Sequence, residues 1–185
     1  MRYWAKPGHA RCIVQLDNLE AAVNVLFERT ASKIVLAAPL GLGKPHRLLN
    51  AIYKAVEKDK DRSLSIFTAL SLTPPKAGSD LEKRFLQPFL DRHFGDDFPS
   101  LHYAVAQRCN ALPGNISVQE FYMQSGGLLN SSQAQRNYNS LNYTHVASAV
   151  AEKNINVLVQ KVAREPGGSR LSLSCNPDLT FDLLD

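Results

Sequence analysis

The first pattern in the sequence that is suited to chemistry is a short segment with two glycines, Gly41–Pro45 (GLGKP). It follows the apolar run Ile34–Ala38 and precedes a stretch whose apolar residues recur at helical spacing. Glycine permits positive φ and lets backbone N–H groups approach a ligand closely. The free amides at a helix N-terminus favour an anionic or carbonyl oxygen. We therefore predict that this segment faces a ligand, and a ligand-free turn is the alternative that the spacing leaves open.

The same segment does not match the common nucleotide-binding motifs. A Walker A motif requires a hydroxyl residue after its lysine, and here Lys44 is followed by Pro45. The third glycine of a dinucleotide-binding fingerprint is replaced by His46. The ligand class is therefore not set by this spacing.

The surrounding patterns predict the elements that would position the segment. Helical spacing indicates helices over Leu19–Arg29, Pro45–Glu57, Ser79–Phe94 and Thr144–Lys153, with caps at Asp17–Asn18 and Ser79–Asp80. Pro88 is expected to kink or split the third of these. Apolar runs indicate buried strands over Lys33–Ala38, Leu64–Leu72 and Asn156–Ala163, and a short strand over Leu101–Ala106. Ile116–Phe121 fits either a strand or the start of a helix.

A strand, a helix and a second strand in succession form a βαβ unit, which joins parallel strands by a right-handed crossover. We therefore predict an α/β fold, an open and mostly parallel sheet flanked by helices. Ile34–Ala38, Leu64–Leu70 and Asn156–Val162 are expected among its central strands.

Composition is that of a soluble globular domain. The chain has 185 residues, 44% of them hydrophobic and 21% charged, and its 21 Lys and Arg against 17 Asp and Glu give a net charge of +4. The basic residues are scattered, so we predict no nucleic-acid partner. No secretory signal and no apolar run of membrane-spanning length is visible, which favours a cytoplasmic protein without a membrane partner. Cys12, Cys109 and Cys175 lie far apart and are expected to be free thiols, with no metal site.

Several blocks of the sequence resemble one family. These blocks extend from about Lys33 to the end of the chain. In chain order they are LGLGKP, the helix that begins LLNAIY, LSIFTALSL, NYNSLNYTHVASAV, NVLVQKVA and SLSCNPDLTFDLL. They resemble the N-terminal domain of acetyl-CoA hydrolase/transferase proteins, a branch of the class I CoA-transferases. The resemblance covers most of the chain, and the first thirty residues carry little of it.

This resemblance implies a fold akin to CoA-transferases and ribose-phosphate isomerases. It also implies an enzyme that transfers CoA between small carboxylic acids or hydrolyses acyl-CoA. CoA is then a substrate, and no tightly bound cofactor is expected. The family forms its glutamyl-CoA thioester on a glutamate of a second domain, and its motif is absent from residues 1–185. We therefore expect residues 1–185 to be one N-terminal domain of a longer protein, inactive alone, with that second domain as a partner and a homo-oligomer as a possible assembly.

The candidate substrate-binding residues combine the glycine segment with the turn and tyrosine-containing block further along. No catalytic residue is assigned within the chain. The substrate-binding candidates are Gly41, Leu42, Gly43, Lys44, Pro45, Ser125, Gly126, Tyr143 and His145.

Each charged or aromatic candidate also has a structural interpretation. Lys44, His46 and Arg47 can assist the phosphates of CoA, but a position at the surface of the helix N-terminus is the simpler expectation. His145 resembles a family position and is also suited to a structural hydrogen bond. Glu120 is a carboxylate in an apolar setting near glycines, and a structural role is preferred to a nucleophilic one.

Two other functions share the predicted architecture. A non-catalytic ligand-binding or scaffold domain would keep the sheet and the glycine turn, since a fold does not determine function. A sugar-phosphate isomerase or deaminase would need acid and base carboxylates that the sequence does not place.

Overall fold

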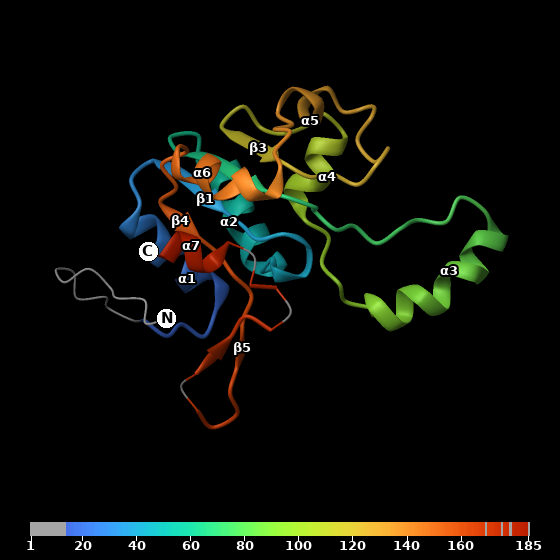
Figure 1. Cartoon of the computed structure of the whole chain (residues 1–185), viewed down its shortest axis with the longest axis horizontal. Helices are drawn as coiled ribbons and strands as arrows, with labels where there is room; N and C mark the ends of the chain where they lie inside the picture. Colours follow the sequence, from blue (N-terminus) through green and yellow to red (C-terminus); the bar gives the residue numbers. More distant parts are fainter. Residues whose placement is uncertain (1–13, 169, 175, 178, 185) are drawn as a thin grey trace.

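Alternate apolar residues of the first strand face opposite sides of a parallel sheet. The computed structural model describes residues 14–168, 170–174, 176–177 and 179–184. Its sheet has the strand order β3-β2-β1-β4, all parallel, so β1 and β2 are central (Figure 1). The strands are β1 (Lys33–Ala37), β2 (Ser63–Thr68), β3 (Ile116–Glu120) and β4 (Val157–Leu158). The predicted α/β class and parallel sheet are therefore confirmed.

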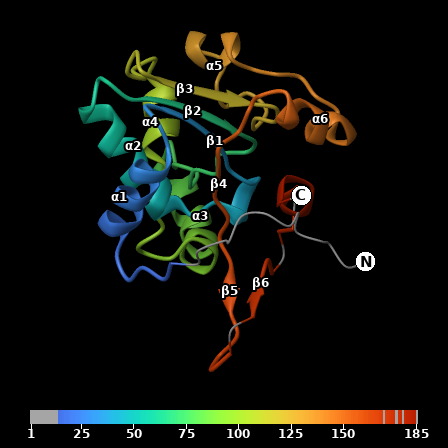
Figure 2. The same cartoon turned by 90° about the vertical axis from the view of Figure 1, so that its left-hand side faces the viewer.

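Helices cover both faces of this sheet. Helices α1, α2 and α4 lie on one face and α6 on the other (Figure 2). The helices are α1 (Leu19–Arg29), α2 (His46–Lys58), α3 (Asp80–His93), α4 (His102–Arg108), α5 (Ser132–Arg136), α6 (Val146–Ala151) and α7 (Thr180–Leu184). Two short 3-10 helices are η1 (Gly41–Gly43) and η2 (Tyr143–His145), and β5 (Ala163–Arg164) pairs antiparallel with β6 (Leu171–Ser172). None of the helices in the described part of the chain is long and apolar enough to cross a membrane.

Two hydrophobic clusters hold these layers together. On the first face, Ile34 and Leu36 of β1 pack with Leu49 and Ile52 of α2, and all four are essentially inaccessible to solvent. On the second face, Phe67 of β2 packs with residues of α6 and stacks on a neighbouring aromatic ring. Burial of each such side chain contributes about 1.5–3 kcal/mol.

The two predicted helix caps that precede α1 and α3 are present. Asn18 Oδ1 accepts a hydrogen bond from Ala21 N at 2.8 Å, and Ser79 Oγ accepts one from Glu82 N at 3.2 Å. Helix α3 runs through Pro88 without being split. It stands away from the sheet on two extended connections and has no buried residue (Figure 1).

The strand predicted over Leu101–Ala106 is wrong, because these residues lie at the start of α4. Leu101, Tyr103 and Gln107 are buried, which is a helical rather than an alternating pattern. The helix begins where Asn50 Oδ1, on α2, accepts a hydrogen bond from His102 N at 2.8 Å. A cap supplied by a residue so distant in the sequence is invisible to local patterns.

The predicted third central strand is also wrong in place and length. Only Val157 and Leu158 pair with β1, at the edge of the sheet. Before them, the Asn156 side chain accepts from Val35 N at 2.8 Å and donates to Lys33 O at 2.9 Å. An amide side chain thus occupies ladder positions that a longer strand would fill with its backbone. Ile116–Glu120, which the sequence left open, is a strand.

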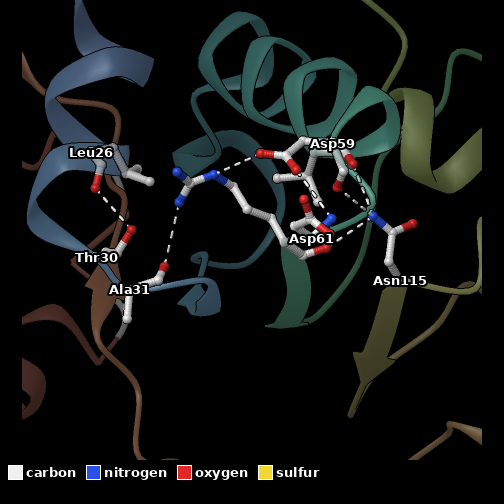
Figure 3. Close-up of polar contacts among 8 residues, drawn as sticks. Leu26, Thr30, Ala31, Asp59, Asp61 and Asn115 are labelled. Atoms are coloured by element: carbon white, nitrogen blue, oxygen red, sulfur yellow. Dashed lines mark hydrogen bonds and ion pairs between the residues drawn. The ribbon is translucent and has the colours of Figure 1, made fainter.

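Asn115 holds the turn between α2 and β2 against the start of β3. Its Nδ2 donates to the carbonyl oxygens of Val56, Asp59 and Arg62 at 2.9, 3.1 and 3.0 Å. Figure 3 shows this side chain pointing into the turn that carries Asp59 and Asp61. One side chain therefore links three carbonyl groups of the turn, two of which, Val56 O and Asp59 O, also accept backbone N–H groups from Asp59 and Arg62.

We predict that Asn115→Ala lowers the free energy of unfolding by about 1–3 kcal/mol, because it removes the hydrogen bonds that tie this turn to the start of β3, including the one to Arg62 O. Urea unfolding followed by circular dichroism measures this loss. Ser117→Ala, at an exposed position of the same strand, is the matched control and is expected to change stability by less than about 0.5 kcal/mol. Equal effects of the two substitutions would contradict the role of Asn115.

Candidate functional site

The carboxyl ends of β1 and β2 are joined by the side chain of Lys44. This lysine is fully buried, and its Nζ donates to Pro39 O at 2.7 Å, to Leu70 O at 3.3 Å and to Ala69 O. An ammonium group has three donors and no acceptor, so it suits a place where several carbonyl oxygens meet. The expectation that Lys44 lies at the surface is therefore wrong.

The predicted ligand-facing segment forms a compact turn after β1. Gly41 has φ +55°, a conformation that glycine adopts without strain. Gly43 N donates to Leu40 O at 3.3 Å and Lys44 N to Gly41 O at 3.4 Å, so these two amides are used within the turn. Leu42 differs from its neighbours because its side chain is 58% exposed. Pro45, half-buried, leads into α2.

Gly43 is required by packing within the chain. A Cβ at this position would lie 2.8 Å from Asn176 Cγ and 3.0 Å from Pro39 Cγ. Lys161 N donates to Gly43 O at 2.8 Å, and the Asn176 amide donates to Leu40 O. The groups that come close to Gly43 are thus side chains of this chain, Asn176 and Pro39.

The two residues after the turn differ in exposure. His46 is buried against Phe98, with ring centroids 4.8 Å apart, which corrects its predicted surface position. Its Nδ1 lies 3.0 Å from Lys44 O, and burial lowers the pKa of its imidazole. Arg47 is exposed, as expected, and pairs with Asp97 at 2.6 Å.

The other predicted binding residues lie further along the chain, after β3. Ser125 and Gly126 occupy an exposed turn, in which Gly126 has φ +74°. Tyr143 and His145 are exposed in η2, and the Tyr143 ring lies edge-on to Phe121 at 6.4 Å. The structure therefore distributes the nine candidates along the carboxyl edge of the sheet instead of gathering them at one point.

A buried polar cluster lies at the same edge, between β2 and β3. Glu120 is only 2% exposed and accepts a hydrogen bond from Ser71 Oγ at 2.5 Å. Ser71 Oγ is also 2.8 Å from the hydroxyl of Tyr103, which is fully buried. Burial raises the pKa of the Glu120 carboxyl, opposed by the Ser71 hydrogen bonds and by the charge of Lys44. Burial and the nearby Glu120 also raise the pKa of Tyr103.

A small cavity adjoins this cluster. Its volume is about 20 Å³, which accommodates roughly one water-sized group. Glu120, Ser71 and Gln107 are among its lining residues, and Gln107 is 1% exposed. Within the described part of the chain, Gln107 Nε2 is a buried donor without an acceptor. A native structure rarely leaves a buried polar atom in this state, so the cavity is a candidate for an oxygen-bearing ligand.

The sequence indicated Glu120 by its apolar setting but gave no sign of its partners. Ser71 lies in the segment after β2, and Tyr103 and Gln107 lie on α4, so all three are distant from Glu120 in the sequence. A glutamine on the buried side of α4 indicates a polar site only when the segment is known to be a helix.

Among the described residues, no group of His, Cys, Asp or Glu is arranged to hold a metal ion. Cys109 is a free, exposed thiol, and Cys12 and Cys175 lie outside the described residues.

Comparisons of this chain with protein-family models, with curated proteins and with solved structures each found no significant match.

We predict that Lys44→Met lowers the free energy of unfolding by at least about 2 kcal/mol, because hydrogen bonds from a charged donor to three carbonyl oxygens are lost. Thermal and urea unfolding measure the effect. Lys54→Met, at an exposed position of α2, is the matched control and should change stability by less than about 0.5 kcal/mol. A stable Lys44→Met protein would show that the cation is dispensable.

We predict that the stability of the wild-type protein falls relative to Glu120→Gln as the pH rises above about 4.5, the ordinary pKa of the side chain. The folded carboxyl has the higher pKa, so the folded state binds more protons than the unfolded state in this window and loses stability as they dissociate. Urea midpoints of both proteins between pH 4.5 and 8 measure the difference. The opposite contribution of His46 is common to both proteins and cancels. Parallel curves would contradict a raised pKa.

Proposed function

We propose that this chain is the N-terminal domain of an acetyl-CoA hydrolase/transferase, with the carboxyl edge of its sheet facing an acyl-CoA thioester. In this proposal a glutamate of a second domain forms the covalent glutamyl-CoA thioester, and the reaction is CoA transfer between carboxylic acids or hydrolysis of acyl-CoA. The support is the sequence resemblance together with the arrangement of the blocks that carry it.

The observation that carries the proposal is that these blocks meet around one turn. Gly43, in LGLGKP, accepts a hydrogen bond from Lys161, in NVLVQKVA, and lies against Asn176, in SLSCNPDLTFDLL. Val146 and Val150, in the NYNSLNYTHVASAV block, belong to the hydrophobic cluster that also contains Leu40 and Leu179. Blocks far apart in sequence thus contact one another at the edge where open α/β sheets bind ligands.

Leu42 is the residue of the turn that is best placed to meet a substrate. Its side chain is exposed, whereas Gly41, Gly43 and Lys44 are buried and maintain the shape of the turn. In the proposed role the turn forms a fixed wall beside the thioester, and the exposed leucine contacts the apolar part of CoA. Preorganised surfaces of this kind lower the entropic cost of binding.

A scaffold domain of the same fold is the alternative that the internal contacts favour. Two amides of the turn bond within it, Lys44 bonds to backbone carbonyls, and Gly43 packs on Asn176, all of which a structural turn alone would also show. Ligand binding at Leu42 separates the two functions.

We predict that the purified chain binds CoA weakly, turns over no acetyl-CoA, and loses binding by roughly threefold to tenfold in Leu42→Asp. The change removes apolar contact and adds a charge of the same sign as the CoA phosphates. Saturation-transfer NMR with CoA measures binding, and release of free thiol measures turnover.

Leu81→Asp, at an exposed position on α3, is the control and is expected to bind CoA as the wild type does. Equal CoA signals for wild type, Leu42→Asp and Leu81→Asp would reject the turn as a binding surface and favour the scaffold function. Turnover by the chain alone would show that the nucleophile lies within it.

A further inference from the structure

We infer that the cavity between β2, β3 and α4 is a binding site for the carboxylate group of a small monocarboxylic acid, held by Gln107, Glu120 and Arg108. The inference deepens the proposed function, and its place in an acyl-CoA reaction rests on that proposal. The binding itself is a property of residues within this chain.

The first step of the argument is the unused donor. Gln107 lies on the buried side of α4, and its Nε2 has no acceptor among the described residues although the side chain is 1% exposed. It lines the cavity of about 20 Å³. A buried amide without a partner is destabilising, so an acceptor oxygen in the cavity would relieve a cost that the fold otherwise carries.

The second step is the protonation state of the neighbouring acid. Glu120 lines the same cavity, accepts from Ser71 Oγ and is buried. Its carboxyl is biased towards the neutral form by burial, and a neutral carboxyl has an O–H to donate. The charged or titratable groups that face it are Lys44, from the start of α2, and Tyr103, from α4. The Gln107 amide is thus a donor for one acceptor group in the cavity, and the protonated form of Glu120 adds an O–H donor beside it.

The third step is charge and access. Arg108 and Gln124 line the cavity and are exposed, so the cavity reaches the surface of the molecule. Within the described residues no ion pair of Arg108 is found. The positive charge of Arg108, an exposed residue of the cavity lining, favours an anion, and a cavity of about 20 Å³ admits little more than one oxygen atom. A small carboxylate matches both the positive charge and the small volume. One of its oxygen atoms would enter the cavity, and the rest of the molecule would remain outside, on the side of Arg108.

The test uses sodium acetate as the probe and the ¹⁵N-labelled chain as the protein. Acetate is expected to shift the side-chain amide signal of Gln107 saturably, with sodium chloride at equal ionic strength as the reference. Gln107→Leu should weaken acetate binding by roughly tenfold or more while leaving the urea midpoint unchanged or higher. A purely structural glutamine would instead lose stability on this substitution.

Two further variants make the result independent of that one substitution. Arg108→Met is expected to weaken acetate binding severalfold, while Arg84→Met, the same change on α3, should leave it unchanged. In the wild type, affinity should fall as the pH rises, because an ionised Glu120 repels acetate. Glu120→Gln should bind acetate with little dependence on pH.

If acetate produces no saturable shift of the Gln107 side-chain amide signal, the inference is overturned, and the cavity holds at most a water molecule. Equal acetate affinities for wild type, Gln107→Leu and Arg108→Met would also overturn it, because the binding would then lie elsewhere on the surface. These outcomes leave the CoA measurements on Leu42→Asp unaffected. Failure of the acetate site and failure of the proposed function are therefore distinguishable.

Discussion

The contact of the Lys44 ammonium with the carbonyl oxygens beyond β1 and β2 is the interaction on which the carboxyl edge of the sheet depends. Parallel strands that end side by side leave carbonyl groups without ladder partners, and buried carbonyls without donors are unfavourable. Lys44 supplies three donors at that point and directly precedes Pro45, the N-cap of α2. Strand ends, turn and helix start are thereby fixed relative to one another, and the charge also acts on Glu120.

Side-chain amides perform the same task elsewhere in the fold. Asn50 caps α4, Asn115 holds the turn before β2, Asn156 continues the ladder beside β1, and Asn176 donates to the carbonyl before η1. In each case a short polar side chain satisfies backbone groups of a segment distant in sequence. The sheet is therefore closed at its ends by long-range polar contacts, whereas its middle depends on apolar packing.

The difference between these two kinds of contact explains how far the sequence predicts the structure. The apolar periodicities of β1, α2 and β2 predict the elements that they form, because hydrophobic pattern is a local property. Helix α4 was predicted as a strand, because its cap Asn50 is distant in the sequence. The strand expected over Asn156–Ala163 is present only as the short edge strand β4, beside which the Asn156 side chain takes ladder positions. Among site residues, the exposed turn around Ser125 follows from its glycines. The burial of Lys44 does not follow from the sequence, because a lysine after a glycine is ordinarily solvated.

At the carboxyl edge of the sheet, an unsatisfied polar group lies beside the cavity beyond the ends of β2 and β3, whereas two amides of the glycine turn have partners. In the turn, the amides of Gly43 and Lys44 bond to Leu40 and Gly41, so fixed internal partners occupy donors that an oxyanion would need. Between β2 and β3, Glu120 and the orphan amide of Gln107 border a cavity that other residues have not filled. A ligand gains most where the folded chain leaves polar groups unsatisfied, because binding then removes a penalty in addition to forming a contact. If the edge of the sheet binds a ligand as proposed, the turn would therefore contribute shape, and the neighbouring cavity would contribute the donor for an oxygen atom.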